Sequence, residues 1–298
     1  MKVKLACLAL LLIAACGATH GSGNAYPSPP TSALAAWEGF PVTKVPRPII
    51  AYWDLRPTGG GFTSGNGKIA GFCNKFTLST VLPVQVPAQA VATWANGASA
   101  AYPSISASAA FFAMSHAPSQ MQNQDCAAVE PLDVTGVRFG TAQITTDRGA
   151  ATMSAWLFTV TGVMGDLPYP ALPPPAFWKG SMTGLSLGES ATVSPDGRIL
   201  TFHFTGAPST AGPCGADYSG AVAESSSAVA VAVLAIPHES SGGPVMCTAI
   251  AAFRSVTVAL ATPLGGRVVA NASGDAVEAC PETVPPASGP GLGATARC

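Results

Sequence analysis

Charged side chains are scarce in this chain. Asp, Glu, Lys and Arg together make up 10% of the 298 residues, whereas an average soluble domain has roughly 25%. The 14 basic residues are balanced by 15 acidic ones, and they form no basic stripe with interleaved aromatic residues. Nucleic-acid binding needs a concentrated positive surface, so we expect no nucleic-acid partner.

Long hydrophobic runs are also missing. The longest apolar run near the start, Leu5–Ala15, falls well short of the roughly 20 residues that a membrane-spanning helix needs. It follows Lys2 and Lys4 and ends in small residues. A basic start, a short apolar core and small residues at the end are typical of a secretion signal.

The end of this leader matches a lipobox. Residues 12–16 read Leu-Ile-Ala-Ala-Cys, which looks like the signal of bacterial lipoproteins and predicts a signal peptide over residues 1–16. We expect a diacylglyceryl group on Cys16, which would attach the chain to the membrane. At roughly 0.8 kcal/mol per buried CH₂, two acyl chains give stable anchoring where one is marginal. The alternative is an ordinary signal peptide cut after Ala18, with Cys16 discarded.

Closely spaced metal-binding cysteines are absent as well. Beyond Cys7 and Cys16 no two cysteines have the C-x₂₋₄-C spacing of zinc sites, and we expect neither a metal nor another cofactor. An even number of cysteines in an exported chain indicates disulfides. Six cysteines allow 15 pairings, and we favour the sequential pairs Cys73–Cys126, Cys214–Cys247 and Cys280–Cys298.

No convergent catalytic set is visible. Residues 184–188 match the G-x-S-x-G pattern of hydrolases, in which the serine occupies a sharp turn between a strand and a helix. A strand and a turn follow here instead of a helix, so we predict a loop between strands and assign no catalytic residue. Candidate partners of such a serine do occur later in the chain, namely Asp196, His203, Asp217 and His238. His203 lies between two phenylalanines on a predicted strand and should point away from them, as a surface or edge residue.

Aromatic residues make up only 7% of the chain. Trp156 lies in the middle of a predicted strand and should belong to the core. Trp94 and Trp178 lie near loops and are our candidates for exposed aromatic binding residues, because exposed aromatic side chains commonly mark binding surfaces.

Alternation of apolar and polar residues dominates the rest of the chain, for example in Val134–Ile144, Thr152–Val163 and Ala228–Ile236. This period is typical of strands with one buried face. The Pro-Asp-Gly turn within Glu189–Gly206 predicts a β-hairpin. An alanine-rich stretch, Ser106–Met114, is compatible with a short helix but has no clear start or stop signal, so its structure is left open.

These patterns predict a mostly β fold with two tandem antiparallel β-sandwich-like modules, separated by a proline-rich run. The alternative is one larger sandwich. The predicted parts are the signal peptide 1–16, a Pro/Gly/Ser-rich tether 17–48, a first β module 49–166, a linker 167–177, a second β module 178–282 and a Pro/Gly-rich tail 283–298. Within the tether, Trp37 and Phe40 are able to dock onto the body.

Together with the lipobox, several segments resemble those of uncharacterised secreted lipoproteins of actinobacteria. They are residues 146–150, 155–162, 213–218, 222–225, 247–249, 256–258 and 262–269. The resemblance covers about the second half of the body. It implies an exported, anchored β protein and is compatible with pairing of Cys214 with Cys247, but it carries no activity.

We therefore expect a cell-envelope lipoprotein with a non-catalytic binding or structural role at the bacterial surface, its partner an envelope protein or glycan. One alternative is an envelope hydrolase acting on ester or glycan bonds. A second is a solute-binding lipoprotein of a transporter, although that class normally alternates strands and helices over two lobes.

Overall fold

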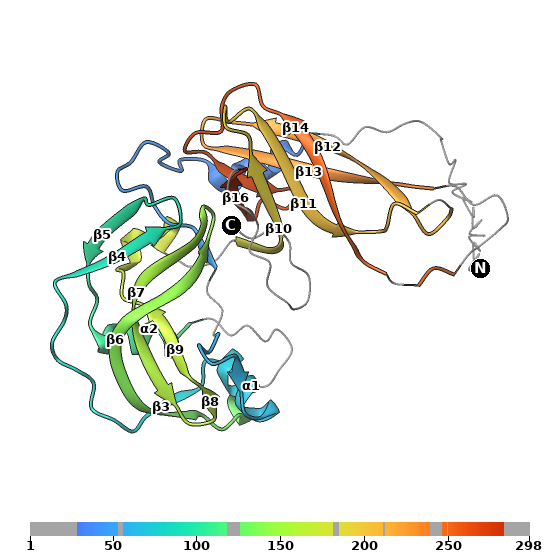
Figure 1. The fold of residues 1–298 in the computed structure, drawn as a ribbon. Coiled ribbons are helices and arrows are strands. Elements are labelled where there is room, and N and C mark those ends of the chain that lie inside the picture. The colour runs from blue at the N-terminus through green and yellow to red at the C-terminus, as the bar shows by residue number, and fades with distance from the viewer. Residues whose placement is uncertain are drawn as a thin grey trace, which may run out of the picture.

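The computed structural model describes residues 29–52, 56–117, 126–180, 185–210, 212–238, 246–248 and 250–282. Strands account for 47% of these residues and helices for 14%, and most of the strands belong to two seven-stranded sheets (Figure 1). The first is a curled, mostly antiparallel half-barrel, and the second is a mixed sheet that nearly closes into a barrel. The predicted mostly β class is confirmed.

The first sheet has the strand order β1-β6-β7-β4-β5, with β3 beside β6 and β9 beside β7. All its pairings are antiparallel except the one between β3 and β6. Its strands are β1 (Ala51–Tyr52), β3 (Phe76–Leu78), β4 (Gln89–Trp94), β5 (Ser99–Pro103), β6 (Leu132–Thr146), β7 (Gly149–Val160) and β9 (Asp166–Pro170). A separate two-stranded sheet joins β2 (Gly61–Phe62) to β8 (Val163–Met164).

Two helices accompany the first sheet, and both begin at a serine cap. Helix α2 (Ala107–Ser115) occupies the stretch whose structure the sequence left open, and Ser106 Oγ accepts a hydrogen bond from Ala109 N at 3.1 Å. It buries Ala107, Ala110 and Met114 in the core beside Trp156 and Phe158. Helix α1 (Gly65–Phe72) is capped in the same way by Ser64. Trp156 is 2% exposed, as its predicted place in the core requires.

The second sheet has the strand order β12-β13-β15-β16-β10-β11-β14. Its members are β10 (Leu185–Val193), β11 (Ile199–Gly206), β12 (Ala216–Glu224), β13 (Ala228–Pro237), β14 (Ala252–Ala259), β15 (Val268–Asn271) and β16 (Ala276–Pro281). The pairs β10–β16 and β13–β15 are parallel, so this sheet is not antiparallel throughout. The predicted hairpin is confirmed as β10 and β11, and Gly197 supplies the positive φ of its turn.

The second sheet curls until its edge strands β12 and β14 approach each other. Gly220 on β12 permits this approach, because a Cβ there would lie 2.9 Å from Cγ1 of Val258 and 3.1 Å from Cγ2 of Val256. The prediction of a sandwich is therefore corrected. Closing a sheet on itself buries its inner face without a second sheet packed against it, and the inner face holds a core of Leu200, Phe202, Val229, Val231, Val256, Val258 and other apolar residues.

The segment predicted as a tether is in part a structured cover of the second sheet. Residues Thr31–Trp37 form a 3₁₀ helix, and Trp37 and Phe40 are 4% and 3% exposed. Both pack with Ala230 and Val268 of the second sheet, and Trp37 Nε1 donates to the Gly274 carbonyl at 3.0 Å. The first described residues thus pack against the second sheet, the strands of the first sheet follow them in the sequence, and the strands of the second sheet come last.

The proline-rich run 167–177 is not a linker, and that prediction is also corrected. Its first residues belong to β9, which pairs with β7. Leu167 and Leu172 are at most 2% exposed and belong to the core of the first sheet. An edge strand tolerates proline because one side of it needs no ladder hydrogen bonds, and β9 pairs with β7 alone in the described part of the sheet.

Disulfides Cys73–Cys126 and Cys214–Cys247 are present, as predicted. Such bonds persist in oxidising compartments and indicate an extracytoplasmic protein. Cys280 is disulfide-bonded, but its predicted partner Cys298 lies outside the described residues, as do Cys16, the rest of the leader and the tail 283–298. No helix in the described ranges combines the length and apolar character needed to cross a membrane.

Candidate functional site

The mouth of the nearly closed second sheet holds a pocket of about 460 Å³. It is lined by Ser186, Gly188, Glu189, Phe204, Thr205 and Val233. The first three come from β10 and the next two from β11. Val233 comes from β13, which is separated from these strands by β15 and β16 in the strand order of the curled sheet. Mouths of β-barrels are common places for small-molecule sites, and this volume lies in their usual range.

The strand register explains why a carboxylate and an aromatic ring meet here. Ser190 pairs with His203, so the preceding residue Glu189 lies beside Phe204, on the opposite face of the sheet from that pair. Further along both strands the inner face continues with Ala191 and Phe202, which are 1% exposed each. The apolar core therefore forms the floor of the pocket, and Glu189 stands where that core meets solvent.

An irregularity in β10 brings Glu189 to this position. Leu185 pairs with Ala276 and Ser190 with Glu278, so β10 advances five residues while β16 advances two. Gly188 lies within this bulge at φ +109°, a conformation that residues with a side chain rarely adopt. Bulges re-aim neighbouring side chains and are frequent beside binding sites.

Two hydrogen bonds hold the Glu189 carboxylate in place. Its Oε2 accepts from Ser186 Oγ at 2.9 Å and from Asn271 Nδ2 at 2.8 Å. Asn271 is itself fixed, because its Oδ1 accepts from the backbone N–H groups of Ser273 and Asp275, each at 3.0 Å. The other carboxylate oxygen, Oε1, has no hydrogen-bond partner among the described residues. One oxygen is thus committed to the protein and the other is available to a ligand.

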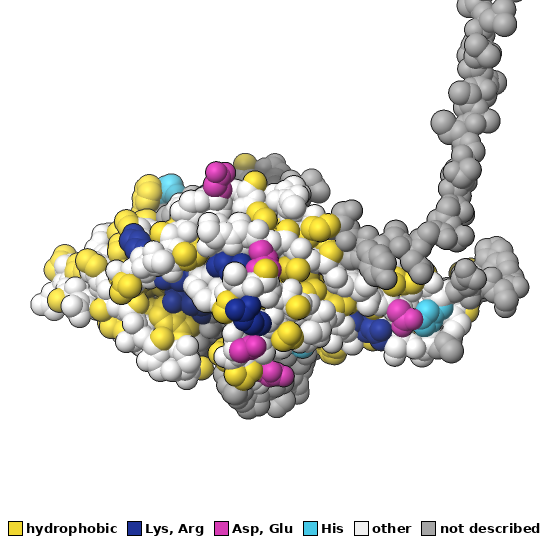
Figure 2. Space-filling view, turned by 90° about the horizontal axis from the view of Figure 1, so that it is seen from above, with side chains coloured by type: hydrophobic (Ala, Val, Ile, Leu, Met, Phe, Trp, Pro, Cys, Tyr) yellow, Lys and Arg dark blue, Asp and Glu magenta, His cyan; other side chains and the backbone are white. Residues whose placement is uncertain are grey.

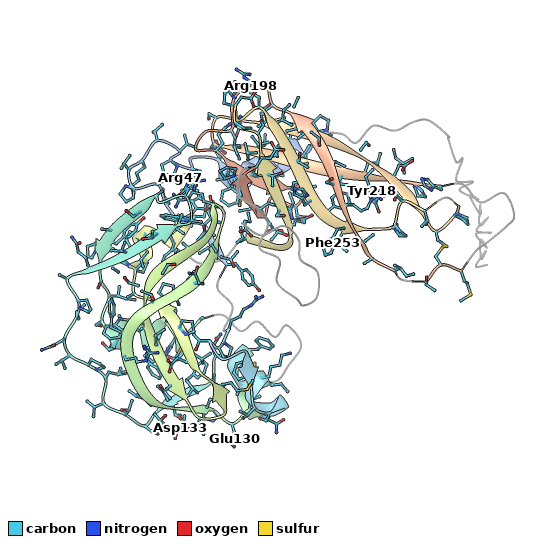
Figure 3. The ribbon with its side chains drawn as sticks, in the orientation of Figure 1. Arg47, Glu130, Asp133, Arg198, Tyr218 and Phe253 are labelled. Atoms are coloured by element: carbon cyan, nitrogen blue, oxygen red, sulfur yellow. A yellow bond between two sulfur atoms is a disulfide. The ribbon has the colours of Figure 1, made fainter. Side chains whose placement is uncertain are left out.

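A second polar group lies beyond Phe204 in the same row of the sheet. Phe204 pairs with Arg254, whose guanidinium carbon lies 5.2 Å above the ring of Tyr218. Arg254 Nη2 donates to the Ala216 carbonyl at 3.2 Å, and Tyr218 packs edge-on against Phe204 at 4.9 Å. Arg254 therefore links β14 to β12, the two edge strands of the sheet. Tyr218 is labelled in Figure 3.

The serine of the G-x-S-x-G match lies in strand β10 and not in the loop that the sequence analysis predicted, and no helix follows it, as expected. Ser186 belongs to β10, and its Oγ bonds only to Glu189 among the described residues. A nucleophilic serine needs a neighbouring base, usually a histidine. No histidine is among the described residues that line this pocket.

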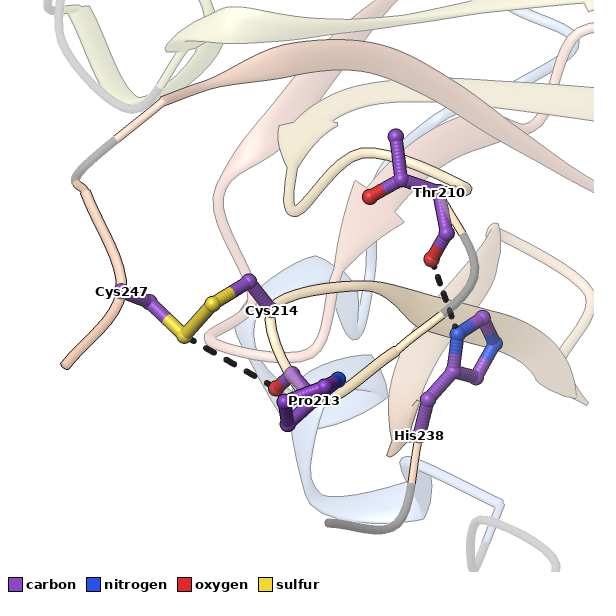
Figure 4. The surroundings of a disulfide bond; sticks show 5 residues. All are labelled: Thr210, Pro213, Cys214, His238 and Cys247. Atoms are coloured by element: carbon purple, nitrogen blue, oxygen red, sulfur yellow. Dashed lines mark hydrogen bonds between the residues drawn. A yellow bond between two sulfur atoms is a disulfide. The ribbon is translucent and has the colours of Figure 1, made fainter. Parts of the chain in front are cut away.

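The two candidate histidines lie elsewhere. His203 is on the outer face of β11, as predicted, with Nε2 3.2 Å from Thr192 Oγ1, and burial lowers its pKa below the ordinary value. His238 has Nδ1 3.1 Å from the Thr210 carbonyl (Figure 4) and Nε2 3.1 Å from Asp217 Oδ2. Both ring nitrogens of His238 are engaged, so neither is available to take a proton from a substrate.

The Asp217–His238 contact lies beside the Cys214–Cys247 disulfide. Figure 4 shows His238 and the disulfide on either side of the turn that leads into β12. The backbone N–H of His238 also donates to the Gly215 carbonyl at 3.0 Å. These contacts together tie the end of β13 to the start of β12, which is a structural role.

The tryptophans proposed as a binding surface do not form one. Trp94 is 5% exposed, with its Nε1 donating to Thr146 Oγ1 at 3.0 Å, so its predicted exposure is wrong. Trp178 is half-buried against Phe40, with ring centroids 5.0 Å apart. Both residues lie near loops in the sequence, but the chain that covers them comes from distant segments.

Sequence reasoning missed Glu189 and Asn271. The only local signal was the glycine before Glu189, which marks an irregular strand, and nothing in the sequence connects positions 82 residues apart. Within the described ranges no group of three or more His, Cys, Asp or Glu side chains is placed to hold a metal ion.

The surface around the sheets is sparsely charged. On the face drawn in Figure 2, charged side chains are few and are interspersed with apolar and uncharged polar surface. Comparison with known proteins adds no relative, since no family model, curated protein or solved structure matches this chain.

Proposed function

We propose that this protein is a cell-envelope lipoprotein that binds a small ligand at the mouth of its second sheet and does not transform it. The observation that carries this proposal is the pocket of about 460 Å³ with the fixed Glu189 carboxylate at its rim. Apolar walls with a few well-placed polar groups are typical of small-molecule sites. Among the described lining residues there is no histidine to activate Ser186, which favours binding over hydrolysis.

Anchoring is the second part of the proposal. The lipobox at residues 12–16 supports a lipid on Cys16, and the disulfides support export. Intact-mass analysis of the membrane fraction tests this part: we expect a chain that begins at Cys16 and carries a diacylglyceryl mass. A lipid-free chain beginning at Gly17 or later would contradict it.

The binding site is tested by filling it. A thermal-shift screen of small envelope components, including amines, sugars and short peptides, is run on the purified chain with its disulfides formed. Val233→Trp places a large ring in the pocket, and Val91→Trp makes the same change on the exposed face of β4.

We expect at least one compound to raise the melting temperature of the wild type and of Val91→Trp, but not that of Val233→Trp. A screen without any stabilising compound, or equal stabilisation of all three proteins, would refute the site.

A further inference from the structure

We infer that the ligand of this pocket carries a protonated amine, which donates to the free oxygen of Glu189. The inference rests on the proposed binding function and names the chemical class of the ligand. It follows from three features: the hydrogen bonds of Glu189, the surroundings of its charge, and the apolar walls of the pocket.

The hydrogen bonds leave Glu189 as an acceptor with spare capacity. An ionised carboxylate has about four acceptor positions, and the described residues fill two of them, both on Oε2. Ser186 Oγ and one N–H of Asn271 Nδ2 already donate to Oε2, so the open hydrogen-bonding position of the carboxylate is its acceptor Oε1. The rim therefore selects a ligand group that donates hydrogen bonds.

The charge of Glu189 has no counterion in the described part of the barrel. Arg267 pairs with Glu224 at 2.8 Å, and Arg198 Nη1 donates to the Ala261 carbonyl at 2.8 Å. Arg254 is directed to Ala216 and to the ring of Tyr218. A half-buried carboxylate without an ion pair favours a cationic ligand over a neutral one and disfavours an anionic one.

The walls define the rest of the ligand. Phe204 and Val233 present apolar surface next to the carboxylate, so a compact apolar body attached to the amine would displace water from them. A charge-assisted hydrogen bond in such partly dry surroundings is stronger than a neutral one. The geometry thus favours an amine on a short hydrophobic body.

The test compares three probes of similar shape by isothermal titration calorimetry at pH 7: 2-phenylethylamine, 2-phenylethanol and 3-phenylpropanoate. Each is titrated into the wild type, Glu189→Gln and Glu282→Gln. The Glu189→Gln change preserves the shape of the side chain and removes its charge, and Glu282 is a matched exposed carboxylate outside the pocket.

We expect the amine to bind the wild type about tenfold or more tightly than the alcohol, and the propanoate to bind most weakly. Glu189→Gln should remove the advantage of the amine and leave alcohol binding unchanged, whereas Glu282→Gln should behave as the wild type. The comparison of probes on the wild type stands even if a variant fails to fold.

Equal affinity for amine and alcohol, tightest binding of the propanoate, or unchanged amine binding in Glu189→Gln would overturn the amine assignment. The amine assignment would also be overturned if none of the three probes bound while another compound of the screen stabilised the wild type but not Val233→Trp. Failure of the whole screen would instead overturn the proposed function itself, so the two failures are distinguishable.

Discussion

Arg47 and Asp147 form an ion pair across 100 residues of sequence, with Arg47 Nη1 2.7 Å from Asp147 Oδ2. Their side chains are 11% and 3% exposed. Arg47 lies just after the segment that covers the second sheet. Asp147 lies at the turn between β6 and β7 of the first sheet. The Asp147 carbonyl also accepts from Ala279 N on β16 at 2.9 Å. The pair therefore joins the two sheets, and Figure 3 shows Arg47 between them.

Replacing Arg47 with Met should destabilise the protein strongly, because the buried Asp147 carboxylate would lose its hydrogen-bonded cation and keep only Arg148, whose Nε is 3.9 Å from Oδ1. Removing one partner of a buried pair costs about 3 kcal/mol or more, measured as the free energy of unfolding in urea. Arg138→Met is the matched control: Arg138 pairs with Asp166 at 2.7 Å but is 62% exposed, and such a pair is worth about 1 kcal/mol or less. Similar losses in the two variants would contradict this account of the joint.

The neighbouring Arg148 should behave in the opposite way. Burial lowers its pKa, and its Nε and Nη2 are buried without a hydrogen-bond partner among the described residues. The guanidinium stacks 3.9 Å above Trp94, a contact worth about 1 kcal/mol, which is comparable to the cost of one unsatisfied buried group. We expect Arg148→Met to leave the free energy of unfolding unchanged or to raise it by up to about 2 kcal/mol. A loss above about 1 kcal/mol, the worth of that stacking contact, would show that the cation is needed there.

The two disulfides should contribute almost equally to stability. They close loops of 53 and 33 residues, for which chain entropy predicts about 4 kcal/mol each. The double variants Cys73→Ser/Cys126→Ser and Cys214→Ser/Cys247→Ser are compared with the wild type by urea denaturation. Large losses in both are expected; an unchanged midpoint in either would mean that its native contacts hold the same segments without the bond.

His203 should make the protein less stable in mild acid. Burial lowers the pKa of the folded imidazole below its ordinary value of about 6.5, so the unfolded chain takes up a proton first as the pH falls. Stability attributable to this group is present above about pH 6.5 and is lost as the pH falls toward the folded pKa. Urea midpoints at about pH 7.5 and about pH 5 measure the effect, and His203→Gln should show a smaller difference between them. An equal or larger difference in the variant would refute this role.

Local features of the fold could be predicted from the sequence. The Pro-Asp-Gly turn requires only neighbouring residues, and the hairpin of β10 and β11 follows from it. The position of His203 opposite to Phe202 and Phe204 follows from the period of a strand. The loop of 33 residues between Cys214 and Cys247 was short enough for sequential pairing to be the simplest arrangement.

The sequence by itself determined that strands with one buried face would form, since alternation of side chains is a property of each strand alone. It could not distinguish a sandwich from a curled sheet, because in both cases every strand buries one face. Only the tertiary structure decided that β12 would approach β14, that Trp37 would cover the second sheet, and that Asn271 would hold Glu189 at its mouth. Each of these depends on which distant segments meet, and that choice is made by the packing of the whole chain.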